Sequence, residues 1–286
     1  MKKILVTGTH GQLGADVVKE LANSEYQIIG VDKDEMDLRD SFAIKETLNK
    51  HRPDVIIHCG AYTDVERAED EYDTCMLING SATRDISSYA SKHDIPIIYI
   101  STDYVFDGTK DAPYTEEDVP NPLNVYGRSK LLGEQYIAEL CEKYFILRIS
   151  WVFGIQGHNF VKTMLRLSKK MISIDVVNDQ FGTPTATRDV AVLIKQLLVS
   201  DKYGLYHVTN EGECSWAEFA KEIFRINNKT TFVNQIPASS FATKAMRPQN
   251  SRMSKQKLVE AGFLMLPHWQ DSLKIWSDEY GQLERV

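Results

Sequence analysis

The sequence has few cysteines, no long apolar run and only a small excess of acidic residues. Its four cysteines, at positions 59, 75, 141 and 214, form no CxxC pair, which argues against a disulfide framework and favours a reducing cytoplasm. No apolar stretch is long enough to span a membrane, and the first residues predict a strand rather than a signal peptide. The formal net charge of −7 argues against general binding of nucleic acid. We therefore expect a globular, cytoplasmic protein that binds neither nucleic acid nor membranes.

The first fourteen residues carry the motif around which the chain is organised. Residues 4–6 form a short apolar run that is typical of a buried parallel strand. Gly8 permits a tight turn, Gly11 lets the backbone approach a pyrophosphate, and Gly14 lets the following helix pack close to the strand. The N–H groups at the start of that helix face the anion. The context predicts a dinucleotide site, with a purely structural turn as the alternative, because the spacing is GxxGxxG rather than GxGxxG.

Apolar runs and helical periodicity alternate through the first half of the chain. We expect strands at 26–31, 55–59, 96–100 and 144–149, and helices at 41–50, 72–93 and 125–142. This alternation predicts an α/β fold, a Rossmann-type doubly wound parallel sheet over residues 1–150. The pattern is looser beyond, with helices expected at 158–169, 188–199 and 215–226 and strands at 174–177 and 205–208. We interpret 151–286 as a smaller, partly interleaved substrate-binding lobe, parts of whose segment 171–208 rejoin the main sheet.

Polar residues follow the strands at the edge where ligands of parallel sheets bind. Asp32 ends the second strand, where a carboxylate commonly accepts a hydrogen bond from the ribose 2′-hydroxyl of NAD. Lys33 follows directly and offers the opposite charge to a 2′-phosphate. The two residues favour different cofactors, so we expect a relaxed preference with NADPH ahead of NADH.

Tyr126 and Lys130 stand four residues apart near the start of a predicted helix, so they share one helical face. A lysine ammonium at this place favours the tyrosinate and lowers the pKa of the phenol. A tyrosine tuned in this way exchanges a proton with a carbonyl or alcohol oxygen near neutral pH. Thr102, at the end of the fourth strand, offers its hydroxyl to the same oxygen. The YxxxK spacing alone is common, but together with the glycine turn it predicts an oxidoreductase site.

These motifs resemble the extended short-chain dehydrogenase/reductase family. The resemblance extends over nearly the whole length, and its more specific stretches are 11–14, 61–63, 101–108, 124–130, 148–154, 159–165, 179–185 and 247–251. It implies NADPH-dependent reduction of the C4 ketone of a dTDP-linked 4-keto-6-deoxy sugar, dTDP-4-dehydro-6-deoxy-L-mannose. The product would be dTDP-L-rhamnose, a nucleotide sugar used in polysaccharide biosynthesis.

The resemblance also implies a role for each matching position. Tyr126 would be the proton donor, Lys130 would tune it and bind the nicotinamide ribose, and Thr102 would orient the keto oxygen. Cofactor contacts are expected from the glycine turn and the strand ends: Gly8, Gly11, Gln12, Leu13, Gly14, Asp32, Lys33, Asp37, Leu38, Ala61 and Thr63, besides Tyr126 and Lys130. The sugar would lie against Thr102, Tyr104, Val105, Tyr126 and Trp151.

The chemistry of the residues leaves several points open. Arg247 is a candidate clamp for a diphosphate, with a surface arginine as the alternative. Related dehydratases carry Thr-Asp-Glu where this chain has Thr102, Asp103 and Tyr104, so an acid–base group for elimination is missing here. An epimerase or dehydratase with tightly bound NAD, and a non-catalytic regulatory subunit, remain the competing interpretations. The residues predict no metal site, while dependence on Mg²⁺, which some relatives show, and formation of a homodimer are left open.

Overall fold

The larger part of the molecule is built on one six-stranded parallel sheet with the order β10-β5-β4-β3-β1-β2. The computed structural model describes residues 1–283. The strands of this sheet are β1 (Lys3–Thr7), β2 (Gln27–Val31), β3 (Val55–His58), β4 (Ile97–Thr102), β5 (Tyr144–Ile149) and β10 (Gly204–His207). The Rossmann-type fold class predicted from the sequence is confirmed.

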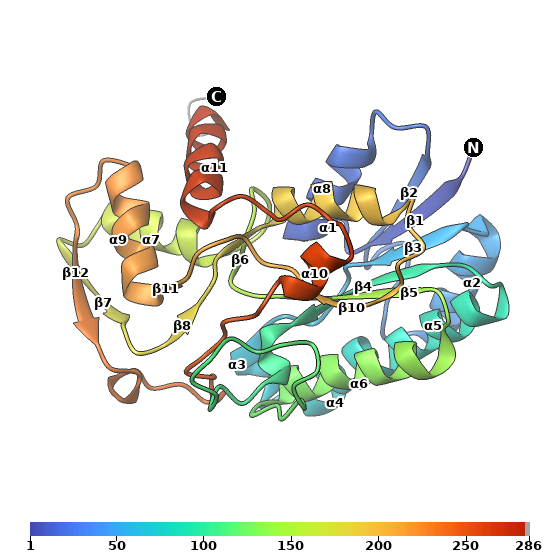
Figure 1. Cartoon of the computed structure of the whole chain (residues 1–286), viewed down its shortest axis with the longest axis horizontal. Helices are drawn as coiled ribbons and strands as arrows, with labels where there is room; N and C mark the ends of the chain where they lie inside the picture. Colours follow the sequence, from blue (N-terminus) through green and yellow to red (C-terminus); the bar gives the residue numbers. More distant parts are fainter. Residues whose placement is uncertain (284–286) are drawn as a thin grey trace.

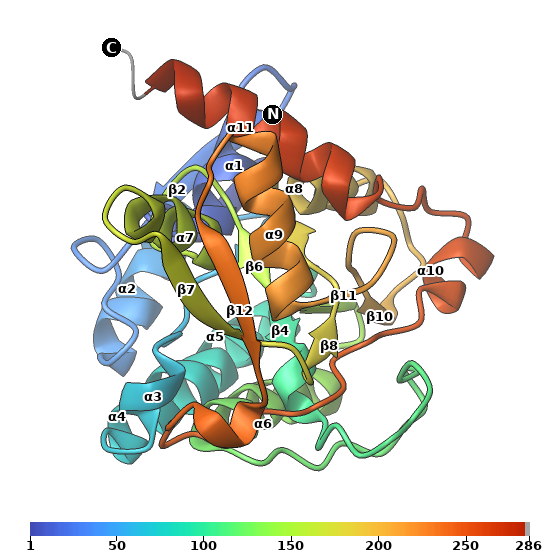
Figure 2. The same cartoon turned by 90° about the vertical axis from the view of Figure 1, so that its left-hand side faces the viewer.

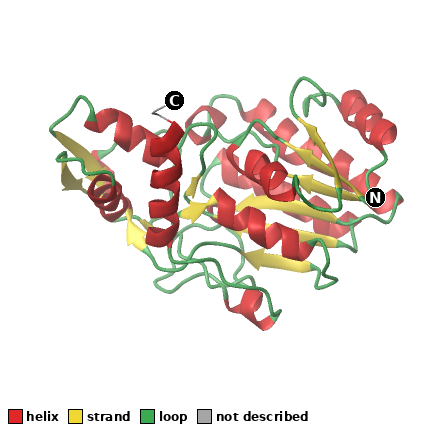
Figure 3. Cartoon of the chain, turned by 90° about the horizontal axis from the view of Figure 1, so that it is seen from above, coloured by secondary structure: helices red, strands yellow, loops and turns green. Residues whose placement is uncertain are grey.

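Helices cover both faces of the sheet, which explains why the central strands are continuous apolar runs rather than alternating ones. Every residue of β3 and β4 is buried. One face carries α1 (Gln12–Leu21) and α8 (Thr187–Leu197), and the other carries α2 (Ser41–His51), α5 (Ala82–Lys92) and α6 (Val125–Leu140). Figure 1 and Figure 3 show the sheet between these two layers.

A second lobe lies at one end of the sheet and faces the viewer in Figure 2. It has its own apolar core. Its centre is the parallel pair β7 (Ser173–Val177) and β12 (Phe232–Ile236), packed against α7 (Phe160–Ser168) and α9 (Trp216–Ile226). Two short strand pairs belong to the same lobe: β6 (Val152–Phe153) with β9 (Thr185–Ala186), and β8 (Phe181–Gly182) with β11 (Cys214–Ser215). The remaining elements are α3 (Val65–Ala68), α4 (Tyr72–Met76), η1 (Leu77–Ser81), η2 (Asp103–Val105), η3 (Ala238–Ser240), α10 (Gln256–Glu260) and α11 (Trp269–Leu283).

The chain passes between the lobes several times. The strand predicted at 205–208 is β10, which pairs with β5 in the large sheet, whereas the strand predicted at 174–177 is β7 of the second lobe. The predicted helix 72–93 is two helices, α4 and α5, joined by the π-helical turn η1. Within the described residues, no helix combines the length and the apolar character needed to cross a membrane.

Candidate active site

A cleft of about 910 Å³ lies at the C-terminal ends of the large sheet's strands and reaches the second lobe. Almost all the residues predicted for the site line it, although they come from separate parts of the sequence. The predicted residues that line the cleft are Gly8, Gly11, Gln12, Leu13, Gly14, Asp32, Lys33, Asp37, Leu38, Ala61, Thr63, Thr102, Tyr104, Tyr126, Lys130 and Trp151. The topology of the sheet therefore brings the cofactor motif and the Tyr–Lys pair into one cavity.

The glycine turn connects β1 to α1. Gly8 has a φ of 70°, in the left-handed region that favours glycine. A Cβ on Gly14 would lie 2.2 Å from the carbonyl oxygen of Gly8, so any side chain there would force the helix away from the strand. No side chain caps the first turn of α1, which leaves backbone N–H groups for an anion. The turn has the shape and the donors that a pyrophosphate requires.

Two carboxylates and two cations line the end of the cleft beyond β2. Asp32 accepts the backbone N–H groups of His10 and Lys33, each at 2.8 Å. Arg39 donates from Nε to the carboxylate of Asp37 at 2.9 Å, and this bonding lowers the pKa of Asp37 to about 2. Asp32 is thus partly engaged by the backbone of the glycine turn and of its own turn. Lys33 brings positive charge to the same end, whereas the charge of Arg39 is paired with Asp37.

Thr102, Tyr126 and Lys130 come together from β4 and α6. Asn124 caps α6 by accepting the N–H of Gly127 at 2.8 Å, and the first turns of the helix then place Tyr126 and Lys130 on one face. Burial raises the pKa of Tyr126, and hydrogen bonding with Thr102 opposes that rise in part. A phenol with a raised pKa keeps its proton at neutral pH, as a proton donor must.

Lys130 differs from what the sequence reasoning expected. Its ammonium is buried, 4.0 Å from the ring centroid of Tyr99. Burial lowers the pKa of Lys130 to about 7, and the negative charge of Glu134 opposes this in part. The pKa of Tyr126 is thus raised in this structure, where the sequence reasoning expected it to be lowered, because burial is the largest influence on both groups.

A buried ion pair holds α6 against the sheet next to this lysine. Glu134 accepts from Nε and Nη2 of Arg148 on β5, at 2.9 and 2.7 Å. The hydroxyl of Ser101 on β4 donates to the same carboxylate. Both charged side chains are almost fully buried. The pair therefore fixes the position of Tyr126 and Lys130 relative to the end of β4.

Two predicted substrate contacts lie outside the cleft lining. Val105 is completely buried in a small apolar cluster with Phe106, Tyr114 and Met253. Its neighbour Tyr104 lines the cleft instead and meets Tyr126 edge to face, with ring centroids 5.9 Å apart.

Arg247 is the second of these residues. It forms an ion pair with Glu66 of α3 at 2.7 Å. Burial raises the pKa of Tyr104 to about 12, and the charge and hydrogen bonding of Arg247 oppose that rise in part. Its charge is thus already compensated within the protein. Its role as a diphosphate clamp stays a prediction.

Sequence reasoning did not assign a role to several other residues of the site region. Asp103 lines the cleft; it is 4% exposed, burial raises its pKa to about 6, and its Oδ2 has no hydrogen-bond partner among the described residues. Asn79 in η1 accepts from the N–H of Tyr62 at 2.8 Å and donates to its carbonyl at 3.0 Å, which fixes the loop carrying Ala61 and Thr63. Trp216, at the start of α9, lines the cleft from the second lobe.

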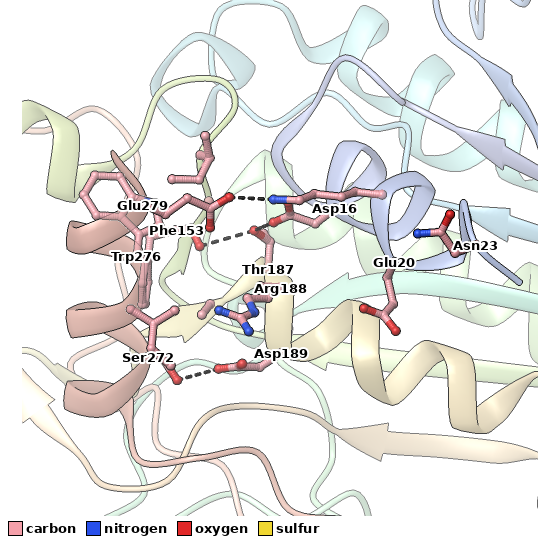
Figure 4. Close-up of a pocket in the computed structure, with 15 residues that line it drawn as sticks. Asp16, Glu20, Asn23, Phe153, Thr187, Arg188, Asp189, Ser272, Trp276 and Glu279 are labelled. Atoms are coloured by element: carbon pink, nitrogen blue, oxygen red, sulfur yellow. Dashed lines mark hydrogen bonds and ion pairs between the residues drawn. The ribbon is translucent and has the colours of Figure 1, made fainter. Parts of the chain in front are cut away.

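A second pocket of about 490 Å³ lies between α1, α8 and α11 and shares no lining residue with the cleft (Figure 4). Its carboxylates are engaged within the protein: Asp16 accepts from Thr187, Asp189 from Ser272, and Glu279 pairs with Lys19. Within residues 1–283, no group of three or more His, Cys, Asp or Glu side chains is arranged to hold a metal ion.

The fold and the cleft together define an extended short-chain dehydrogenase/reductase, with the glycine turn, the strand-end threonine and the Tyr–Lys pair in one cavity. Comparison with known proteins narrows this class. The model of the RmlD substrate binding domain matches residues 1–281, and the chain belongs to this family.

Curated proteins and solved structures agree with that membership. The chain is 38% identical over 287 residues to the dTDP-4-dehydrorhamnose reductase of Aggregatibacter actinomycetemcomitans, covering 96% of this chain and 98% of that one. The structure of dTDP-4-dehydrorhamnose reductase from Bacillus anthracis in complex with NADP is 42% identical and superposes with a TM-score of 0.95, covering 98% of this chain and all of that one. The UDP-glucose 4-epimerase of Thermus thermophilus, in complex with NAD, is 18% identical with a TM-score of 0.84, covering 98% of this chain and 99% of that one, and shares the fold alone.

Proposed function

We propose that the protein is a dTDP-4-dehydrorhamnose reductase. It reduces the C4 ketone of dTDP-4-dehydro-6-deoxy-L-mannose to the alcohol of dTDP-L-rhamnose, with NADPH as the reductant. The main support for this proposal is that Thr102, Tyr126 and Lys130 line the same cleft as the glycine turn. The similarity to reductases of this name along nearly the whole chain supports the same substrate.

The residues of the cleft fit a dinucleotide. A Cβ on Gly11 would approach only the carbonyl oxygen of Gly8, at 3.1 Å, so the outer side of the turn is open to a pyrophosphate. The uncapped start of α1 supplies backbone donors. NADPH, when bound, supplies the hydride. The carboxylate of Asp32 is partly engaged, and Lys33 lies at the same end, which supports a preference for NADPH, with its 2′-phosphate, over NADH.

The protein's own part in the reaction is to hold the ketone and to deliver a proton. The Thr102 hydroxyl orients the keto oxygen, and the protonated phenol of Tyr126 donates its proton to that oxygen as the C4 carbon is reduced. Lys130 lies on the same helical face as Tyr126, where it binds the ribose beside the nicotinamide and supplies positive charge as the phenolate forms. The aromatic rings of Tyr104 and Trp151 offer apolar surface to the methyl group at C6 of the sugar.

We further propose that the reaction takes place in the cytoplasm. The thiols of Cys59, Cys75, Cys141 and Cys214 are all free, which supports a reducing compartment. Assembly into a homodimer and a requirement for Mg²⁺ stay predictions. Each is measurable on the purified protein, by sedimentation and by assay with a chelator.

The decisive experiment generates the 4-keto L-sugar in situ, adds protein and NADPH, and identifies the product by NMR. We expect NADPH oxidation and the formation of dTDP-L-rhamnose. Turnover of a different 4-keto nucleotide sugar, with none of this one, would reject the substrate and keep the chemistry. Nicotinamide retained through purification without added cofactor would favour the epimerase or dehydratase alternative, and absence of any turnover would favour the regulatory one.

A further inference from the structure

Trp151 has a backbone conformation that is unusual for a large side chain. It lies two residues after the end of β5 and directly before β6, where the chain first passes from the large lobe to the second lobe. Its φ is 47°. Left-handed φ values are uncommon outside glycine and are tolerated best by Asn and Asp. Conformations of this kind persist only when the surroundings hold them, and they concentrate at functional sites.

Two neighbours from one part of the second lobe hold the indole of Trp151 in place. The ring of Trp216 stacks on it with centroids 3.7 Å apart and an interplanar angle of 12°. The backbone of Gly182 lies directly against it, since a Cβ on Gly182 would be 2.6 Å from Cε2 of Trp151. Phe160 of α7 packs against Trp216, with centroids 4.7 Å apart. We call Gly182, Trp216 and Phe160 the Trp151 platform.

The platform is built from adjacent elements that are linked by hydrogen bonds. Gly182 ends β8 and pairs with Cys214 of β11. The next residue, Ser215, caps α9 in a capping box, accepting the N–H of Glu218 at 3.2 Å while its own N–H donates to the Glu218 side chain at 2.7 Å. This cap fixes the start of α9 and therefore the place of Trp216, the first residue of the helix.

We propose that Trp216 and Gly182 are positioning residues that hold Trp151 at the substrate end of the cleft and thereby set the affinity for the sugar nucleotide. Trp151 and Trp216 both line the cleft, and Thr102 and Tyr126 line it from the large lobe. Gly182 and Phe160 do not line the cleft themselves. The platform acts through Trp151 on substrate binding. This inference rests on the proposed function, which makes Trp151 a sugar contact.

The test compares Trp216→Leu, Trp216→Phe and Gly182→Ala with the control Trp276→Phe. Trp276 stacks on Tyr280 in α11, with ring centroids 4.8 Å apart, and does not line the cleft. Two stacked indoles couple their electronic transitions, so the wild-type far-ultraviolet circular dichroism spectrum contains an exciton couplet. We expect Trp216→Leu to lose the couplet and Gly182→Ala to alter it, whereas the control keeps it.

The expected kinetic effect is a rise in KM for the sugar nucleotide of about 2- to 13-fold, the range that corresponds to one aromatic pair. The kcat and the Kd of NADPH stay within about twofold. Trp216→Phe keeps an aromatic ring against Trp151, so its KM for the sugar nucleotide should lie between the values of wild type and Trp216→Leu. Binding of dTDP-glucose, a stable sugar nucleotide without a ketone, weakens in parallel with the rise in KM.

The outcomes separate this proposal from the proposed function. If wild-type protein does not turn over the 4-keto sugar, the proposed function fails, and dTDP-glucose binding still tests the platform. A lost couplet with unchanged sugar-nucleotide affinity means that Trp216 only packs, and this overturns the proposal. Unchanged affinity in Gly182→Ala overturns it as well, and that variant remains informative if Trp216→Leu does not fold.

Discussion

Replacing Lys130 by Met removes a charge that the fold buries at a cost. We expect Lys130→Met to abolish most of the reductase activity and at the same time to make the protein more stable. The gain in stability depends on pH in a direction that the structure determines. Methionine fills a similar volume without a charge, so the comparison isolates the cost of the buried ammonium.

The magnitude follows from the pKa of Lys130, which burial lowers from 10.5 to about 7. One pKa unit corresponds to about 1.4 kcal/mol, so the buried charged form costs about 4–5 kcal/mol. Between these two pKa values the unfolded chain binds more protons than the folded one, and wild-type stability therefore rises with pH. The penalty is complete below about pH 7 and disappears above about pH 10.5. The free energy of unfolding of the Met variant should therefore exceed that of wild type by about 2–3 kcal/mol more near pH 6 than near pH 9.

Urea unfolding of wild type and variant at about pH 6 and about pH 9 measures this difference. Loss of the contact between the charged Lys130 and the Tyr99 ring offsets part of this gain at acidic pH, by about 0.5–2 kcal/mol. Lys33→Met, on an exposed lysine at the other end of the cleft, is the matched control and should change stability little at either pH. A Lys130→Met variant whose advantage is the same at both pH values, or larger at the alkaline one, would refute the reasoning.

Three further predictions concern the cleft and the ion pair beside it. Tyr126→Phe should lower kcat by about 100-fold or more with little change in the Kd of NADPH; a variant retaining half its activity would contradict the role as proton donor. Lys33→Ala should weaken binding of NADPH more than binding of NADH, measured by fluorescence titration, and equal effects would show that Lys33 does not contact the phosphate. Glu134→Ala leaves Arg148 buried and unpaired and should destabilise the fold by about 3–5 kcal/mol. The paired replacement of Glu134 and Arg148 by Met should recover most of that loss, and a double variant as unstable as the single one would argue against the buried charge as the cause.

Local sequence patterns were sufficient for the elements that form this cleft. The glycine turn, the strand-end Thr102 and the Tyr126–Lys130 pair each depend on residues close together in sequence. The alternation of strands and helices then places them at one edge of the sheet. The strand predicted at 205–208 exists as β10, but the sequence did not reveal that this strand, and not the one at 174–177, would join the large sheet beside β5.

Features that depend on distant contacts or on burial were not visible in the same way. Val105 and Tyr104 are adjacent, yet only Tyr104 lines the cleft, and a one-turn 3₁₀ helix decides which of them does. Arg247 is paired with Glu66, which lies far away in the chain. Asn79 stands in a π-helical turn inside what reads as one continuous helix. The pKa of Lys130 depends on how completely it is buried, which no spacing of charged residues reveals.

The repeated passage of the chain between the lobes has a consequence for how substrate preference is exchanged among relatives. The core of the second lobe is assembled from three stretches, β6 to β9, β11 to β12, and α11, while α8, β10 and α10 between them pack on the large lobe. A chimera cut once after residue 150 would carry β10 with the foreign part and force a foreign strand to fit the edge of β5. A functional graft must instead replace three segments and keep α8, β10 and α10 native. Recombination that keeps both cores intact therefore has to exchange the second lobe as three separate segments. A single crossover after residue 150 exchanges α8, β10 and α10 of the large lobe together with the second lobe.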